Sequence, residues 1–353
     1  MAAPDPPPAP TGQVVALQAN YCRVVLDRPG PGGLRQLLCT RRSRLEKCGL
    51  EVCVGDRVVL AGVDWNEGRA AIADRGSRTS LLARPAVANA TRLAVVVALR
   101  DPTLDPFQLT RFLVTAEATG LPVEVVLTKL DLLPEPAGRR WCRRVRSWGY
   151  PVHGISTRSG EGVGPLQRHL AEAGITVLCG PSGVGKSSLL NLLVPSLHLR
   201  VAPVSGRLRR GRHTTRHVEL FRIGEDALVA DTPGFNTPSL PDDPQALAAS
   251  FPELRQRLGK RACRFSDCRH RGDPGCVAGT DWERYPLYRR CLEELERAET
   301  LRPRRGGDAG GLRNRGGSRL EPVLSLSLRR QSRRRGRQEP LEGLSPPGRE
   351  GSD

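Results

Sequence analysis

Apolar side chains stand two residues apart in several short segments between residues 12 and 75. Glycine, proline and polar residues, which favour turns, separate these segments, among them GQVVALQ, LRQLLCT, VGDRVVLAGVD and GRAAIAD. Successive side chains of a strand point to opposite faces of a sheet, so the alternation predicts strands with one buried face. Closely spaced strands of this kind are typical of a small all-β barrel, which we expect over residues 12–75.

The pattern changes after residue 80, where continuous apolar runs alternate with segments of helical periodicity. The runs LAVVVALR, VEVVLT, VHGIS and ITVLC predict buried strands, as found in parallel sheets. Amphipathic helices are predicted between them, over residues 109–120, 135–150 and 163–174. Because strands and helices alternate, we expect a doubly wound α/β domain over residues 80–240.

The last part of the chain departs from this alternation. Several cysteines and a histidine precede DWERYPLYRRCLEELERAE, which predicts a helix over residues 281–299. A Pro/Ala-rich leader and a Gly/Arg/Ser/Pro-rich tail contain too few apolar residues to form a core, so we expect both to be disordered. The predicted organisation is a leader (1–11), a β domain (12–75), an α/β domain (80–240), a metal-binding domain (245–299) and a basic tail (300–353).

The net charge of +18 indicates an acidic partner. Arginine supplies most of the positive charge, and the run LRRQSRRRGR concentrates it near the C-terminus. Nucleic acid is the partner that this charge favours, although a tail that is merely solvated would have the same composition. Charge alone leaves both interpretations open.

The sequence predicts a reducing, cytoplasmic location without a membrane partner. Its apolar stretches fall short of the roughly 20 residues that span a bilayer. The start, MAAPDPPPAP, lacks the basic and apolar regions of a secretory signal. Seven of the ten cysteines lack motif spacing and are expected to be buried or free thiols.

A phosphate-binding loop is predicted between the run ITVLC and the helical segment KSSLLNLL. The sequence GPSGVGKS matches G-x-x-x-x-G-K-[ST] between a strand and a helix, where backbone N–H groups can converge on phosphate oxygens. Lys186 is expected to reach the β- and γ-phosphates and to assist catalysis, and the Ser187 hydroxyl to bind Mg²⁺. The predicted nucleotide-binding residues here are Gly180, Pro181, Ser182, Gly183, Val184, Gly185, Lys186, Ser187 and Ser188.

Two later segments complete the predicted phosphate site. The run ALVADTPG ends a strand in D-x-x-G, so Asp231 is expected to support the Mg²⁺ shell through water and Gly234 to offer its N–H to the γ-phosphate. The segment GRHTT supplies hydroxyls for Mg²⁺ in a mobile switch. Thr215 is the favoured ligand, and Thr214 is the alternative.

The tetrapeptide TKLD predicts guanine recognition, although it precedes the phosphate loop by about fifty residues. The carboxylate of Asp131 can accept from both N1–H and the 2-amino group of guanine, whereas adenine offers no such pair. Lys129 is expected to lie along the base, and Thr128 occupies the place of the asparagine of many GTPases. Ser156, with Thr157, begins the expected second base loop. The five nucleotide-binding elements follow the cyclic order of an ordinary GTPase, with the chain opened between the third and the fourth element. A circular permutation can rebuild the same site in space when the original termini lie close together.

The segment CRFSDCRHRGDPGC has the composition of a structural zinc site. Three thiolates and one imidazole would complete a tetrahedral shell without an open position. Arginines between these residues indicate a surface that could face RNA. The predicted ligands are Cys263, Cys268, His270 and Cys276.

Together, these motifs and the segment RPAVAN (84–89) resemble the RsgA (YjeQ) family of circularly permuted, ribosome-dependent GTPases over about residues 12–295. The resemblance implies an N-terminal OB-fold, a permuted GTPase core and a C-terminal zinc domain. It implies a role in late maturation of the small ribosomal subunit, with the subunit, its rRNA, GTP and GDP as partners. It also implies one structural zinc ion, and magnesium bound together with GTP. We expect a monomer.

The resemblance also suggests a catalytic histidine. Many switch GTPases have a glutamine just after D-x-x-G that orients the attacking water, but Phe235 stands there. His213 lies in the GRHTT segment, where the family has a histidine, and an imidazole can orient water. Two other functions stay open: a nucleic-acid-binding regulator that uses GTP occupancy with negligible turnover, and an ATPase or kinase in which TKLD has no role.

Overall fold

The structure is a computed structural model, and it describes residues 8–18, 21–42, 49–83, 85–194, 197, 218–231, 238–259 and 261–301, with two short strands beyond them. The chain divides into two compact units, residues 1–295 and 296–353. In the second unit, β14 (Leu312–Asn314) pairs with β15 (Leu320–Pro322). The predictions for most of the leader and for most of the tail lie outside the described residues.

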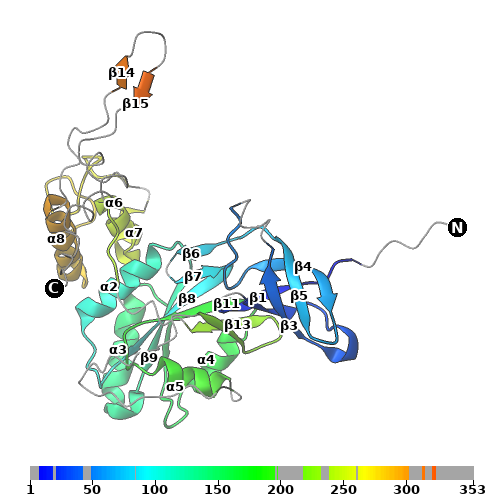
Figure 1. The fold of residues 1–353 in the computed structure, drawn as a ribbon. Coiled ribbons are helices and arrows are strands. Elements are labelled where there is room, and N and C mark those ends of the chain that lie inside the picture. Colours follow the sequence, from blue (N-terminus) through cyan, green and yellow to red (C-terminus); the bar gives the residue numbers. More distant parts are fainter. Residues whose placement is uncertain are drawn as a thin grey trace, which may run out of the picture. The chain divides into compact units, whose positions relative to one another are not determined.

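Five N-terminal strands close into the predicted barrel (Figure 1). They run in the order β1-β2-β3-β5-β4, and β4 pairs again with β1. Alternate side chains of these strands, such as Val14, Val24 and Ile72, form the barrel core. The two-residue spacing therefore places one face of each strand inside. The strands are β1 (Thr11–Gln18), β2 (Tyr21–Leu26), β3 (Gln36–Arg41), β4 (Arg57–Asp64) and β5 (Arg69–Arg75).

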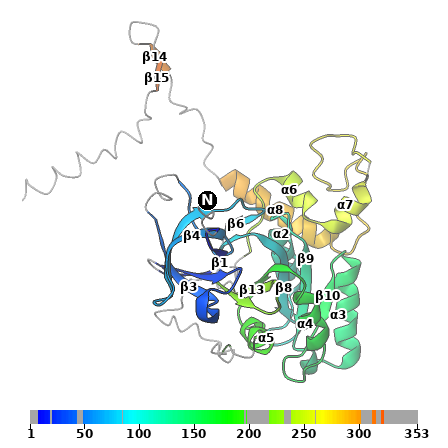
Figure 2. The ribbon, with the colours of Figure 1, turned by 90° about the vertical axis from the view of Figure 1, so that its right-hand side faces the viewer.

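The α/β domain contains a parallel sheet in the order β10-β9-β8-β11-β13. One core joins this sheet to α2 and α3, and another joins its opposite face to α4 and α5 (Figures 1 and 2). The predicted doubly wound arrangement is confirmed. Its strands are β8 (Ala90–Ala98), β9 (Val123–Thr128), β10 (Val152–Gly154), β11 (Gly174–Cys179) and β13 (Ala227–Asp231), and its helices are α2 (Pro106–Glu117), α3 (Glu135–Ser147), α4 (Val163–Leu170) and α5 (Lys186–Leu193).

A short antiparallel strand, β12 (Glu219–Arg222), joins the barrel to this sheet. It pairs with β13 on one side and with β1 on the other, where Ala16 lies opposite Glu219. Arg23 of β2 forms an ion pair with the same glutamate. β12 is not among the predicted strands, because a strand of four residues carries little periodicity. The hairpin of β6 (Leu81–Ala83) and β7 (Ala86–Ala88) connects the two domains along the chain.

The C-terminal domain packs its helices around an aromatic cluster of Phe251, Trp282 and Tyr288, whose rings meet mostly edge to face. The helices are α6 (Pro244–Ala249), α7 (Pro252–Leu258) and α8 (Tyr285–Leu301). The last helix begins four residues later than the predicted position 281. Proline is tolerated only in the first turn of a helix, so Pro286 favours a start at Tyr285.

A buried arginine joins this domain to the α/β domain. Arg284 is fully buried and its Nε lies 2.6 Å from Oε1 of Glu253. Its guanidinium lies 4.9 Å from the ring centre of Trp148 and 4.8 Å from that of Phe251, so aromatic faces from both domains surround the charge. The next residue towards the N-terminus, Glu283, accepts a hydrogen bond of 3.0 Å from Trp148 Nε1. These contacts fix α7 and the start of α8 against the end of α3.

Glu253→Ala is expected to destabilise the fold strongly, because it leaves the Arg284 charge buried without its partner. Breaking a buried ion pair in this way typically costs about 3–5 kcal/mol. Urea unfolding, followed by tryptophan fluorescence, measures the change in the full-length protein. Glu293→Ala is the matched control, since it removes only a partly exposed pair with Arg289 and should cost less than about 0.5 kcal/mol. Equal unfolding midpoints for the two variants would contradict a central role for Arg284.

Candidate functional site

The phosphate loop lies where the sequence predicts it, between β11 and α5. Gly180 has φ +139°, and a Cβ atom there would lie 2.0 Å from the carbonyl oxygen of Val96. Gly183 and Gly185 also have positive φ, of 78° and 98°. These conformations are open to glycine and rarely adopted by other residues. The glycines of the motif are therefore needed for the course of the loop itself.

Lys186, the first residue of α5, turns back onto this loop. Its Nζ donates to the carbonyl oxygens of Gly180, at 2.7 Å, and Pro181, at 2.6 Å. Burial lowers the pKa of Lys186, and the nearby Asp231 carboxylate raises it in part. Asp231 ends β13, next to the phosphate-loop strand. The structure thus brings a lysine and a carboxylate together at the carboxyl edge of the sheet, where α/β proteins bind ligands.

Thr128 connects the TKLD segment to the phosphate loop. Its side chain is buried, and Oγ1 lies 2.5 Å from the carbonyl oxygen of Val184 and 3.3 Å from that of Val97. The contact joins residues 56 positions apart in the sequence. The motif predicts Thr128 at the site, but the partner of its hydroxyl is a backbone group that no sequence pattern marks.

The two predicted base loops meet at Asp131. Ser156 Oγ donates to Oδ1 of Asp131 at 2.6 Å, and the same Oγ accepts from the backbone N–H groups of Arg158 and Ser159. Ser156 is fully buried whereas Asp131 is exposed. A buried hydroxyl therefore orients a carboxylate that faces solvent.

Lys129 adopts a left-handed conformation, with φ +60°. Its Nζ donates to the carbonyl oxygen of Asp101, in the loop after β8, and lies 3.9 Å from Oδ2 of the same residue. Asp101 is not among the predicted site residues, since no motif surrounds it. The loops after three neighbouring strands, β8, β9 and β10, are thus linked by side-chain contacts.

The other predicted residues of the phosphate loop lie in the same turn: Ser182, Ser187 and Ser188, the last two in the first turn of α5. Gly234, His213, Thr214 and Thr215 lie outside the described residues, as does Arg84. Their roles, and those of the residues above in nucleotide binding, stay predictions.

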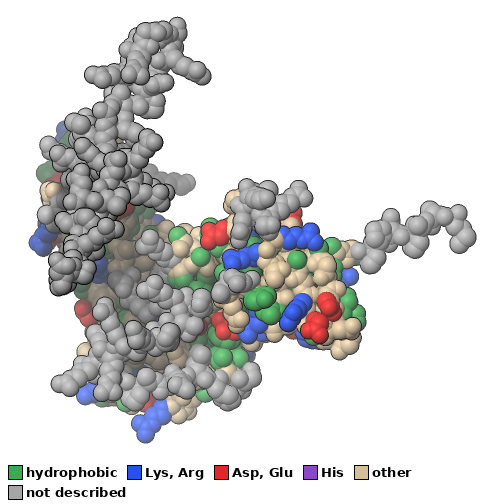
Figure 3. All heavy atoms as spheres, in the orientation of Figure 1, with side chains coloured by type: hydrophobic (Ala, Val, Ile, Leu, Met, Phe, Trp, Pro, Cys, Tyr) green, Lys and Arg blue, Asp and Glu red, His purple; other side chains and the backbone are tan. Residues whose placement is uncertain are grey.

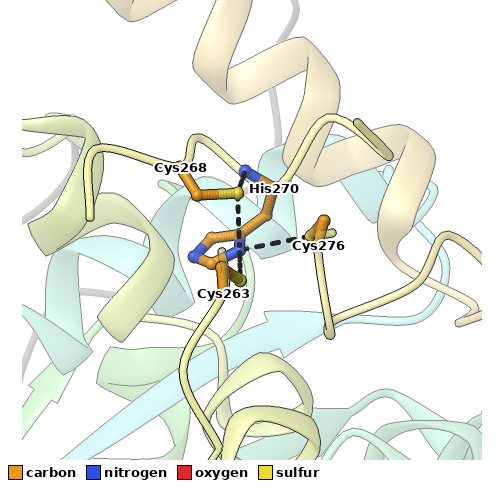
Figure 4. A group of neighbouring side chains, drawn as sticks. All are labelled: Cys263, Cys268, His270 and Cys276. Atoms are coloured by element: carbon orange, nitrogen blue, oxygen red, sulfur yellow. Dashed lines mark hydrogen bonds between the residues drawn. The ribbon is translucent and has the colours of Figure 1, made fainter. Parts of the chain in front are cut away.

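The predicted metal ligands of the C-terminal domain converge (Figure 4). Nδ1 of His270 lies 3.6 Å from Sγ of Cys263, 3.8 Å from Sγ of Cys268 and 3.6 Å from Sγ of Cys276. Burial lowers the pKa of His270, which favours the neutral imidazole that a metal requires. Tyr288 of α8 donates to the carbonyl oxygen of Arg269 at 2.7 Å and so attaches this loop to the helix.

These distances fit a zinc ion. With Zn–S of about 2.3 Å and Zn–N of about 2.05 Å, a tetrahedral shell separates sulfur from nitrogen by about 3.6 Å. The three Sγ···Nδ1 distances match this value to within a few tenths of an ångström. The cluster is therefore compatible with one zinc ion that has three thiolates and one imidazole as ligands.

We expect the purified, reduced full-length protein to retain one equivalent of zinc after mild chelation. The reason is that four protein ligands fill the coordination shell and leave no open position on the ion. Cys263→Ala and His270→Ala should lose this ion and loosen the C-terminal domain, since metal-binding energy is folding energy there. Elemental analysis and limited proteolysis measure both effects. Cys142→Ala, which removes a cysteine outside the cluster, should retain the zinc. Zinc far below one equivalent in the parent would contradict the site.

None of the helices in the described part of the chain is long and apolar enough to cross a membrane.

A family model described as RsgA GTPase matches residues 75–241. A small ribosomal subunit biogenesis GTPase RsgA from Synechococcus sp. (strain CC9311) is 55% identical over 300 residues, which cover 85% of this chain and 98% of that protein.

Two solved structures share the fold. YjeQ from Thermotoga maritima is 30% identical, with a TM-score of 0.67 over 81% of this chain and 98% of that one. YloQ, described as a circularly permuted GTPase, is 26% identical, with a TM-score of 0.66 over 86% of this chain and all of that one. The similarity thus extends over most of the chain. The chain belongs to the RsgA GTPase family.

Proposed function

We propose that this protein binds the small ribosomal subunit and assists its late maturation, hydrolysing GTP to GDP and phosphate with turnover that the subunit stimulates. The observation that carries the GTPase chemistry is the joining of TKLD, Ser156 and the phosphate loop at one edge of the sheet. The relatives named above supply the ribosomal partner. We further propose that the protein acts as a monomer in the cytoplasm.

Guanine selection would depend on Asp131. Its carboxylate, oriented by Ser156, can accept from the two N–H groups that guanine presents side by side. Lys129 would lie along the base, and Thr128 would keep this loop at a fixed distance from the phosphate loop. Adenine lacks the 2-amino donor, which argues against the ATPase or kinase alternative.

Phosphate binding would use the lysine, the hydroxyls and the backbone N–H groups of the site. Lys186 could exchange its two carbonyl partners for β- and γ-phosphate oxygens, where its charge would stabilise the transition state. Magnesium, when bound, neutralises phosphate charge; Ser187 and Thr215 would hold it, Asp231 would support it through water, and Gly234 would donate to the γ-phosphate.

RNA binding would depend on charge that is unevenly distributed along the chain. Figure 3 shows basic, acidic and hydrophobic side chains side by side on the visible face of the barrel. Residues 301–353, in contrast, contain thirteen arginines and no lysine against six acidic residues, a net charge of +7 out of +18. We propose that this segment adds sequence-independent attraction to rRNA phosphates, while the barrel and zinc domain contact the subunit.

Asp131→Asn should lower GTP affinity by about 100-fold, because hydrogen bonds to a charged group contribute about 1.5–3 kcal/mol each, and should shift preference towards xanthosine triphosphate. Titration with fluorescent GTP, XTP and ATP analogues measures the change. Asp101→Asn is the matched control, since it alters a carboxylate beside Lys129 without touching the base reader. A variant that prefers GTP as strongly as the parent does would remove TKLD from base recognition.

His213→Ala should abolish most of the subunit-stimulated turnover while sparing GTP affinity, since an imidazole in the switch segment would orient the attacking water when the segment orders on the ribosome. Phosphate release, with and without purified small subunits, measures this. His217→Ala is a control within the same segment. A stimulated rate within about twofold of the parent would remove His213 from the mechanism. Absence of stimulation in the parent itself would favour the regulator that uses GTP occupancy alone.

A further inference from the structure

Three side chains with metal-binding chemistry converge on the α4 face of the sheet, away from the nucleotide site. They are Glu124 of β9, His153 of β10 and His169 of α4, and their ligand atoms all lie within 4.8 Å of one another. Glu124 stands near the amino end of β9, four residues before Thr128 at the carboxyl end. A strand rises by about 3.3 Å per residue, so the two positions are about 13 Å apart.

Both histidines direct Nε2 at one oxygen of the same carboxylate. Oε2 of Glu124 lies 2.7 Å from Nε2 of His169 and 3.3 Å from Nε2 of His153. The two rings stack, with centroids 4.9 Å apart. Glu124 is 5% exposed, and its second oxygen, Oε1, is buried and has no hydrogen-bond partner. A buried carboxylate oxygen without a partner is costly, and a bound ion is one way to satisfy it.

We propose that Glu124, His153 and His169 bind a divalent transition-metal ion such as zinc, at a site separate from the cysteine cluster. A set of two imidazoles and one carboxylate binds zinc, cobalt or nickel more readily than it binds magnesium. Around zinc, nitrogen and oxygen ligands are separated by about 3.3 Å, so His153 already has the required spacing and His169 would move by roughly 0.6 Å. Water would complete the shell, and bidentate binding would satisfy Oε1 of Glu124.

Arg92 brings a positive charge close to the cluster, and Glu172 pairs with it. Arg92 of β8 places NH1 3.4 Å from Nε2 of His169 and 3.5 Å from Oε2 of Glu172. Glu172 also places Oε1 3.6 Å from Nδ1 of His169. When Nε2 binds the ion, Arg92 retains Glu172 as a partner, and Nδ1–H can donate towards the same carboxylate. Such a carboxylate behind a ligating histidine fixes its ring orientation.

The ion would cross-link β9, β10 and α4, the three elements that carry these residues. β9 ends at Thr128 and β10 leads to Ser156, so the strands behind both base loops would be held to each other and to α4. Binding the folded state alone stabilises it by mass action. The expected effect is therefore thermal stability of the α/β domain, and nucleotide affinity should change little.

The test uses untagged full-length protein that retains one zinc in the cysteine cluster. Cobalt(II) is then added, and binding is followed by calorimetry, by visible absorption and by the thermal unfolding midpoint. We expect a second equivalent to bind with a dissociation constant below about 10 µM, to raise the midpoint, and to add d–d bands without thiolate-to-cobalt charge transfer. A tenfold excess of magnesium should not displace it.

His153→Gln and His169→Gln should each weaken the second equivalent at least tenfold while the cysteine cluster keeps its zinc. Glu135→Gln, which changes an exposed carboxylate of α3 paired only with Arg139, should bind within about threefold of the parent. If one histidine variant does not fold, the other variant and the parent's cobalt spectrum decide. Three results would each overturn the site. They are a parent that binds no cobalt beyond the zinc of the cysteine cluster, added cobalt that shows thiolate-to-cobalt charge transfer, and unchanged cobalt binding in the histidine variants.

Discussion

The hydrogen bond from Thr128 to the carbonyl oxygen of Val184 joins the two halves of a nucleotide site whose sequence order is reversed. Parallel strands place all their carboxyl ends at one edge of a sheet, so β9 and β11 deliver TKLD and the phosphate loop to the same place whichever comes first in the chain. What the permutation cannot supply is the spacing between them. A buried hydroxyl bound to the phosphate loop supplies it, at low cost in side-chain entropy.

The same sheet also connects the site to the domains on either side. Asp231 ends β13, β13 pairs with β12, and β12 pairs with β1 of the barrel, so backbone hydrogen bonds run from the site into the barrel. On the other side, Arg284 and Glu283 attach the C-terminal domain to the end of α3. Both neighbours therefore contact elements of the α/β domain directly, one through backbone hydrogen bonds and the other through buried side chains.

Sequence reasoning succeeded where one residue type has one physical use. The glycines of the phosphate loop, the spacing of Cys263 to Cys276 and the apolar runs of the parallel strands each predicted their place correctly. It failed for contacts that depend on packing between distant segments. β12 is too short to show a period, the start of α8 at Tyr285 was set by a proline that the helical pattern masked, and nothing local marks Arg284 as a buried charge.

Glu124, His153 and His169 illustrate that limit most clearly. The two histidines stand 29 and 45 positions after Glu124, and all three look like ordinary polar residues of two strands and a helix. Only the parallel register, which sets His153 beside Val126, brings them to one face. At the carboxyl edge of this sheet the polar side chains bond to one another and to the backbone, whereas Oε1 of Glu124 is buried and has no hydrogen-bond partner. Since an unpaired buried oxygen destabilises the fold, a bound cation gives a physical reason for this carboxylate to lie there.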